Sequence, residues 1–237
     1  MPLLHSLARR RLQPEEMDQP GLDPARHRAA LRGLARINAW SGSARILWPP
    51  LAALAREAGR PVRVLDVASG AGDVPIRLWK KAQRARLPLR IDGIDRSPVA
   101  VEHARRRAAQ AGADVAFREG DALTGEWPGG YDAVISSLFL HHLKEEQAVA
   151  FLKGAAGAAG RLVLVNDLVR GLPGFLLAWA GTRLLSRCDV VHTDGVRSVE
   201  GAFTVAEARA LAERAGLHGA TVARRWPCRF LLTWRRP

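Results

Sequence analysis

The stretch RVLDVASGAGDVPIRL, which runs from Arg63 to Leu78, decides the fold. It begins as an apolar strand, turns through small residues that include Gly70 and Gly72, and continues as an amphipathic helix. Glycines at such a turn permit backbone conformations that other residues avoid, and they let a ligand approach the main chain. The stretch therefore predicts a nucleotide-like ligand beyond the end of a strand. A tight turn without a ligand is the simpler alternative for this stretch alone.

The chain around this stretch alternates between apolar strands and helical patterns. Strands are expected at VRVLDVA, RIDGID, VAFREG, YDAVISS and RLVLVND. Helical patterns lie between them at 74–86, 98–111 and about 144–155. Continuous apolar strands joined by helices are typical of a parallel sheet that is buried on both faces. The fold class is therefore α/β.

The first sixty residues read as a helical extension in front of this sheet. One helix is expected in DPARHRAALRGLARINAWSG, with Asp23 as its N-cap. A second is expected in ARILWPPLAALAREAG, where Pro49 and Pro50 should interrupt or start it. We therefore divide the chain into an extension over residues 1–60 and a main domain over residues 61–237.

The end of the chain combines one more helix with a hairpin. In TVAEARALAERAG, Thr204 and Glu207 have the spacing of a capping box. Two strands should follow, with Pro227 at their turn.

Composition narrows the class of protein. The 237 residues carry a net charge of +13, which invites a nucleic-acid partner, but nearly all basic residues are Arg and they are spread along the chain. The nucleic-acid interpretation is therefore disfavoured. Cys188 and Cys228 have no metal-ligand spacing, so no metal is expected, and a reducing cytoplasm is the plain reading. We find no signal peptide and no apolar run long enough to span a membrane.

The glycine turn does not fit a dinucleotide. Turns that bind dinucleotides have the pattern G-x-G-x-x-G or A, and its third small residue would fall on Pro75 here. Asp95 ends the second expected strand, where its carboxylate can accept both hydroxyls of a ribose. A cap for the helix that starts near Ser97 is the alternative role of Asp95. Asp121 follows the third strand, where an adenine amino group could be met.

Four segments in order then resemble a known family. VLDVASGAGD, GIDRSP, REGDAL and YDAVISSLFLHHL look like motifs one to four of class I S-adenosylmethionine-dependent methyltransferases, over roughly residues 61–237. The chain is most similar to the small-molecule group of the ubiquinone/menaquinone biosynthesis methyltransferases. One departure is Ala68, where the motif usually has its first glycine. The resemblance implies a Rossmann-like, seven-stranded, mostly parallel sheet with an antiparallel last strand and helices on both faces.

The resemblance also implies a cofactor site for S-adenosyl-L-methionine, with S-adenosyl-L-homocysteine as product. Asp66 would orient the amino group, and Ala68, Ser69 and Gly70 would lie against the methionine part. Asp95 with Arg96 would bind the ribose hydroxyls. Asp121 and Ala122 would face the adenine, and Ser137 with Leu138 would flank the sulfonium.

The acceptor side has several candidates for a catalytic base. A neutral hydroxyl must lose its proton, which favours a base such as histidine. We expect His142 to serve rather than His141, because adjacent residues leaving a strand point to opposite sides. Asp167 ends the fifth strand and should point into the same crevice. His192, with Asp194, is a further candidate on a loop that folds over the site.

An insertion at about 168–203 should cover the acceptor. Its apolar stretch GLPGFLLAWAGTRLLSR favours a hydrophobic acceptor, although simple core packing or contact with a membrane surface are alternatives. The sequence thus favours O-methylation of a small hydrophobic aromatic compound, a phenol, a quinol or a polyketide-like ring. C-methylation of a quinol-like ring, RNA methylation and cofactor binding without catalysis stay open. Against RNA, the fourth strand exits through SSLF rather than an NPPY-type sequence.

Overall fold

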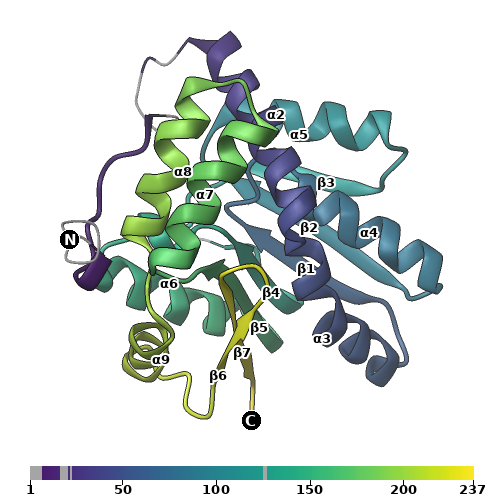
Figure 1. The fold of residues 1–237 in the computed structure, drawn as a ribbon. Helices are drawn as coiled ribbons and strands as arrows, with labels where there is room; N and C mark the ends of the chain where they lie inside the picture. Colours follow the sequence, from purple (N-terminus) through teal and green to yellow (C-terminus); the bar gives the residue numbers. More distant parts are fainter. Residues whose placement is uncertain (1–6, 17–20, 22, 125–126) are drawn as a thin grey trace.

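The computed structural model describes residues 7–16, 21, 23–124 and 127–237. Its seven-stranded sheet has the order β3-β2-β1-β4-β5-β7-β6 (Figure 1). Strands β1 to β5 are parallel, and β7 runs antiparallel to both β5 and β6. The strand bounds are β1 Val62–Val67, β2 Leu89–Asp95, β3 Val115–Glu119, β4 Tyr131–Ser137, β5 Ala159–Leu168, β6 Thr221–Arg225 and β7 Arg229–Arg235. The predicted fold, including its antiparallel last strand, is confirmed.

Helices cover both faces of the sheet. Strand residues such as Val64 and Ile135 pack on one face against α3 (Ser43–Ala58) and α4 (Asp73–Ala85). The alternate residues of the same strands point to the other face and pack against α6 (Glu145–Ala158) and α9 (Val205–Arg214). Helix α5 (Pro98–Gln110) closes a smaller cluster against β3. Burial on both faces explains the continuous apolar strands.

The strand order reverses at β1, which pairs with β2 on one side and with β4 on the other. In open α/β sheets a crevice forms at this switch point, beyond the carboxyl ends of the strands. Three helices lie above that edge: α2 (Pro24–Ser41), α7 (Leu172–Leu185) and α8 (Asp189–Gly201) (Figure 1). The fold therefore places a covered crevice over β1 and β4.

The expected extension over residues 1–60 contains α2, α3 and a segment that precedes them. Residues 1–6, 17–20 and 22 of this extension lie outside the described residues. Asp23 caps α2 as predicted, because its Oδ1 accepts hydrogen bonds from the amides of Ala25 and Arg26. The division of the chain at residue 60 stays a prediction.

One expectation for the extension is wrong. Pro49 and Pro50 neither interrupt nor start a helix, because α3 runs through both of them. A proline inside a helix removes a backbone hydrogen bond and crowds the preceding turn. The buried apolar face of α3, which includes Leu47, Leu51 and Leu54, offsets that cost.

The end of the chain folds as expected. Thr204 Oγ1 accepts a hydrogen bond from the amide of Glu207, and Glu207 Oε2 accepts one from the amide of Thr204, which is the predicted capping box of α9. Strands β6 and β7 form the predicted hairpin around Pro227. Within the described ranges, no helix has the length and apolar character needed to cross a membrane.

Candidate active site

A cavity of about 860 Å³ lies in the crevice over β1 and β4. Sites for small molecules enclose about 300–1,000 Å³, so this cavity is large for a single small ligand. One end lies against the turn after β1 and the ends of β2 and β4, and we call it the cofactor end. The other end lies under α7, α8 and the chain after β4, and we call it the acceptor end.

The turn after β1 has the backbone geometry that its small residues predict. Ala68, Gly70 and Gly72 all have positive φ, at 58°, 52° and 69°. A Cβ on Gly72 would lie 2.6 Å from the ring of Phe117, whereas a Cβ on Gly70 would meet nothing within 4 Å. The space beside Gly70 is part of the cavity. The turn therefore persists with alanine at position 68, and it presents bare main chain to a ligand.

Some buried polar atoms at the cofactor end lack a hydrogen-bond partner among the described residues. Asp66 Oδ1 and Ser69 Oγ are two of them, and both residues line the cavity. Burial, with the nearby charges of Asp73 and Asp95, raises the pKa of Asp66 well above its ordinary value. A cationic group such as an ammonium would satisfy Asp66 and favour its charged form.

Asp95 supports the turn as well as facing the cavity. Its Oδ2 accepts a hydrogen bond from the amide of Gly70 at 2.7 Å, and its Oδ1 accepts one from the amide of Ser97 at 3.0 Å. Ser97, not Asp95, is the N-cap of α5, since Ser97 Oγ accepts a hydrogen bond from the amide of Ala100. The alternative role of Asp95 as the helix cap is therefore wrong.

The other residues predicted for the cofactor also line the cavity. Arg96 and Asp121 are exposed at its edge, and Ala122 is buried. Ser137 ends β4 and Leu138 follows it, with a positive φ of 60°. The structure thus brings together all ten predicted positions, and their individual roles stay predictions.

The acceptor end is mostly apolar. Its lining includes side chains from the inner face of α7, from α8 and from the chain after β4: Phe139, Leu143, Leu177, Ala178, Leu185 and Val199. Residues of the segment 168–203 therefore line the cavity, and its role in covering an acceptor stays a prediction. Leu176, Trp179 and Leu184, also on α7, are exposed.

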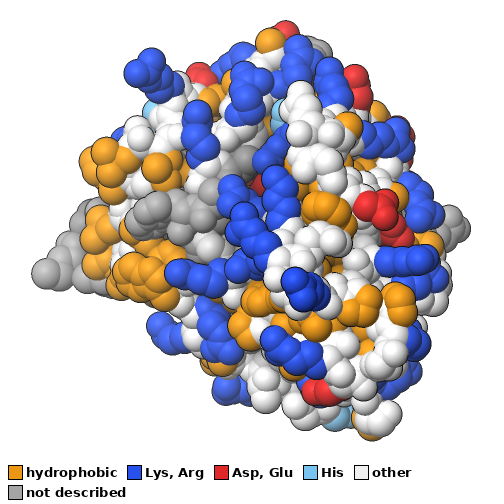
Figure 2. Space-filling view, turned by 90° about the vertical axis from the view of Figure 1, so that its right-hand side faces the viewer, with side chains coloured by type: hydrophobic (Ala, Val, Ile, Leu, Met, Phe, Trp, Pro, Cys, Tyr) orange, Lys and Arg blue, Asp and Glu red, His pale blue; other side chains and the backbone are white. Residues whose placement is uncertain are grey.

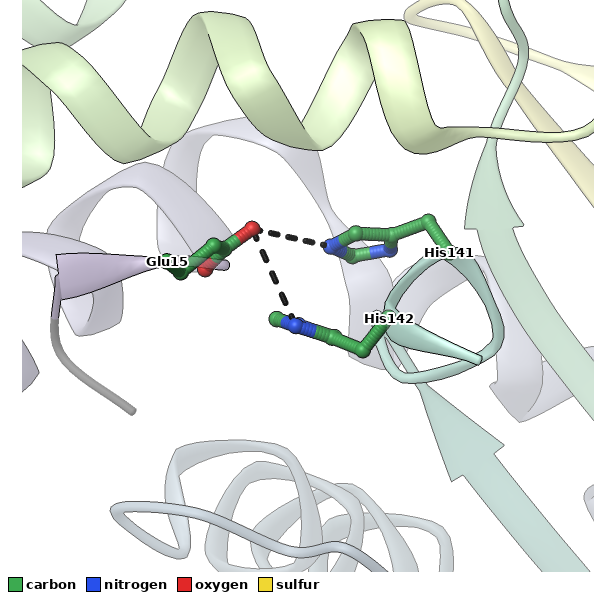
Figure 3. A group of neighbouring side chains, drawn as sticks. All are labelled: Glu15, His141 and His142. Atoms are coloured by element: carbon green, nitrogen blue, oxygen red, sulfur yellow. Dashed lines mark ion pairs between the residues drawn. The ribbon is translucent and has the colours of Figure 1, made fainter. Parts of the chain in front are cut away.

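A polar cluster interrupts this apolar lining. It consists of Glu15, His141 and His142, and Figure 3 shows the carboxylate of Glu15 facing both rings. Glu15 Oε1 lies 3.7 Å from His141 Nε2 and 3.8 Å from His142 Nδ1. Behind the cluster, Asp167 Oδ1 lies 2.6 Å from His141 Nδ1. His142 is the most exposed member, with 23% of its side chain accessible.

The opposite charges in this cluster stabilise one another against the cost of burial. Burial alone would lower the pKa of His141, but Asp167 and Glu15 outweigh it and raise that pKa to about 10. Burial would raise the pKa of Asp167, but His141 lowers it below its ordinary value. Burial likewise opposes the charge of Glu15, and His142 and His141 together lower the pKa of that carboxyl.

Three expectations for the catalytic residues are wrong. Asp167 does not point into the crevice, because it is buried behind His141 and is not among the residues lining the cavity. The rings of His141 and His142 do not point to opposite sides: their centroids are 4.2 Å apart, because the chain turns into a short 3₁₀ helix (Leu140–His142) where strand alternation ends. His192 is not on a loop but inside α8; it bonds to the carbonyl of Ser186 and is not among the residues lining the cavity. Asp194 is buried and accepts a hydrogen bond from the amide of Glu16.

The sequence did not point to Glu15. It belongs to a segment without periodic pattern, which Arg10 fixes by donating hydrogen bonds to the carbonyls of Gly201, His141 and Leu143. The side chain of Ser198 donates a hydrogen bond to Glu15. No local signal in the sequence predicts these contacts.

Comparisons with known proteins agree with this geometry. Residues 64–159 match the family model described as "Methyltransferase domain". A demethylmenaquinone methyltransferase of Thermus thermophilus is 36% identical over 108 residues, which are 45% of this chain and 47% of that protein. A ubiquinone biosynthesis O-methyltransferase of Methylocella silvestris is 34% identical over 131 residues, 53% of this chain and 48% of that protein. The chain thus matches about half the length of these relatives.

A solved structure shares the fold. It is an O-methyltransferase from neocarzinostatin biosynthesis in complex with S-adenosylmethionine and 2-hydroxy-5-methyl naphthoic acid. The two chains superpose with a TM-score of 0.62 and are 23% identical, over 89% of this chain and 57% of that one. At this identity the likeness shows the fold.

Proposed function

We propose that this chain is a class I S-adenosylmethionine-dependent methyltransferase that methylates a hydroxyl oxygen of a small hydrophobic aromatic acceptor. The observation that carries the proposal is the continuity of one cavity: bare main chain and partnerless polar atoms line one end, and an apolar chamber with a histidine–carboxylate cluster forms the other. A donor and an acceptor held in such a cavity meet end to end, which is the geometry that methyl transfer requires.

The cofactor end suits S-adenosyl-L-methionine. Its ammonium group would satisfy Asp66 Oδ1, and its chain would lie beside Gly70, where the cavity is open. The ribose hydroxyls would reach the carboxylate of Asp95, which already orients the turn. When bound, the cofactor supplies an activated methyl group. The residues of this chain position it.

The acceptor end suits a flat apolar ring with one polar substituent. Leu177, Leu185 and Phe139 would contact the ring, and the reacting oxygen would face the Glu15–His141–His142 cluster. The hydroxylated naphthoic acid named for the neighbouring structure is a compound of this class. An apolar chamber inside the fold also favours a small molecule over RNA. Figure 2 shows Lys and Arg side chains scattered over one face of the molecule, with hydrophobic side chains between them.

Calorimetry and product analysis test the proposal. We expect S-adenosyl-L-methionine to bind in the micromolar range and NAD not to bind. The protein should transfer a labelled methyl group to members of a panel of phenols, hydroquinones and naphthols, giving methyl ethers that mass spectrometry and NMR identify. Tight NAD binding, with no response to S-adenosyl-L-methionine, would overturn the proposal.

C-methylation of a quinol-like ring is the second candidate. It is supported by the similarity to the demethylmenaquinone methyltransferase of Thermus thermophilus. The same panel separates the two, because a methyl group on ring carbon and one on oxygen have different NMR shifts.

A further inference from the structure

The Glu15–His141–His142 cluster has the composition of a metal site. Each residue offers one ligand atom, and the three atoms all lie within 4.8 Å of one another. Figure 3 shows both imidazole rings and the carboxylate converging on the same point, although Glu15 comes from the N-terminal segment and the histidines follow β4. Among the described residues this is the one group of three with that property.

The separations within the cluster suit a shared ion better than direct contact. Glu15 Oε1 is 3.7 Å from His141 Nε2 and 3.8 Å from His142 Nδ1. Hydrogen bonds of N–H to oxygen extend to about 3.2 Å, and a bridging water would hold two such atoms roughly 4.6 Å apart. Ligand atoms about 2.0–2.1 Å from a tetrahedral zinc ion are roughly 3.4 Å apart. The two distances to Glu15 lie nearest to the last case, and the ligand atoms of the two histidines lie within 4.8 Å of each other.

The surroundings also resemble those of a metal site. Asp167 accepts a hydrogen bond from His141 Nδ1 and is itself buried, so Nε2 is the ring nitrogen that faces Glu15, and a metal ion binding there would displace the proton on Nε2. Histidines that bind metals commonly have such a carboxylate partner on the other ring nitrogen. Ser198 Oγ donates a hydrogen bond to Oε1 of Glu15, the oxygen that faces the two histidines.

We propose that Glu15, His141 and His142 bind a divalent transition-metal ion such as Zn²⁺, with an open coordination position toward the acceptor end of the cavity. Two imidazoles and one carboxylate suit ions of this class. All three ligand residues line the cavity, so a bound ion is accessible to a small molecule there. The spacing of Cys188 and Cys228, from which the sequence led us to expect no metal, has no bearing on these residues.

The ion would activate the acceptor hydroxyl for the proposed methyl transfer. This role of the ion rests on the proposed function. An acceptor hydroxyl that binds the ion ionises more readily, and its proton leaves to water. The resulting oxygen anion forms a bond to the methyl carbon while the carbon–sulfur bond of the sulfonium breaks. The electron pair of that bond stays on sulfur, so the product is neutral S-adenosyl-L-homocysteine.

Metal binding is measured directly on the full chain. The protein is stripped with EDTA, dialysed and titrated with Zn²⁺ in competition with a chromophoric chelator. We expect one zinc per chain with a dissociation constant in the micromolar range or below. Glu15→Gln and His142→Ala should each weaken it at least tenfold, and Asp167→Asn should weaken it about 10–100-fold. S-adenosyl-L-methionine binding checks that each variant is folded.

His218→Ala is the matched control. His218 also lies beside a carboxylate, at 3.0 Å from Glu213, but both side chains are exposed at the surface. Its replacement should leave zinc affinity unchanged. Equal zinc affinity in the wild type, Glu15→Gln and His142→Ala would overturn the metal site, as would a stoichiometry far below one.

Activity separates this inference from the proposed function. Methyl transfer that continues at full rate in metal-free protein, and is lost in His142→Ala, overturns the role of the ion and leaves the methyltransferase intact. Tight zinc binding that depends on Glu15 and His142, without transfer to any phenol, supports the metal site and counts against the proposed acceptor.

Discussion

The carboxylate of Asp95 accepts a hydrogen bond from the amide of Gly70 at 2.7 Å, and this bond joins the end of β2 to the turn after β1. The same carboxylate accepts a second bond from the amide of Ser97. One side chain therefore fixes both turns that border the cofactor end and still faces the cavity. Binding and local stability are coupled at this residue.

Asp95→Ala should weaken cofactor binding and destabilise the protein together. Hydrogen bonds to a charged acceptor contribute about 1.5–3 kcal/mol, so affinity for S-adenosyl-L-methionine should fall about 10–150-fold. Loss of the bond to the Gly70 amide should also lower the free energy of unfolding by about 1–3 kcal/mol. Calorimetry and urea denaturation measure the two effects. A folded variant with unchanged affinity would show that Asp95 only shapes the turn.

Asp66→Asn should stabilise the ligand-free protein and weaken cofactor binding. Burial raises the pKa of Asp66 above its ordinary value of 3.8, so the native state binds more protons than the unfolded state above that pH. The native protein therefore loses stability as the pH rises from about 4 through the raised pKa. The asparagine variant lacks this loss and should melt at a higher temperature at pH 7.

The same substitution removes the charge that would bind the ammonium of S-adenosyl-L-methionine. Affinity should fall about 10–150-fold. Thermal melts from pH 4 to pH 8, with and without the cofactor, measure both effects. A variant that melts lower than the wild type without ligand would contradict this account of Asp66.

His142→Ala should lower kcat while cofactor affinity stays nearly intact. His142 is the partly exposed member of the acceptor-end cluster, so it is placed to handle the acceptor proton, either directly or as a metal ligand. Groups with that role typically contribute about 10²–10⁴-fold. His192→Ala should have no such effect, because His192 lies inside α8 and bonds to the carbonyl of Ser186, which precedes that helix. A rate loss confined to the His192 variant would contradict the placement of the reacting atoms.

Gly181→Leu should reduce acceptor binding selectively. Gly181 lies on α7 and lines the cavity, and a Cβ there would meet nothing within 4 Å. The Cβ of a leucine therefore has room, and the rest of its side chain should reduce the space in the chamber and raise the KM for bicyclic acceptors more than for monocyclic ones. Gly157→Leu is the control, because Gly157 is exposed on α6 and is equally uncrowded. Equal KM values in both variants would place the acceptor elsewhere.

The sequence predicted the sheet because its signals are local. Strand β5, for example, contains the continuous apolar run Leu162–Val165, and the turn after β1 concentrates glycines where positive φ is needed. The capping box of α9 is likewise contained in four residues. These features follow from neighbours in the chain, so a single sequence is sufficient to place them.

The acceptor end was harder to predict because its contacts are distant in the chain. Glu15 joins His141 and His142 only after the fold brings the N-terminal segment across α8, and no periodicity marks that segment. The orientation of His142 depended on where β4 stops, and an element boundary is the least certain part of a pattern. The sequence therefore identified the two histidines and missed the carboxylate between them.

The segment that carries Glu15 has a consequence for biosynthesis. Glu15 is synthesised long before its partner Ser198, which lies 183 positions later, and Arg10 long before Gly201, which lies 191 positions later. Contacts of such long range form only after most of the chain has emerged. The nascent chain can therefore assemble the first strands of its sheet well before it can close the chamber in which the acceptor would react.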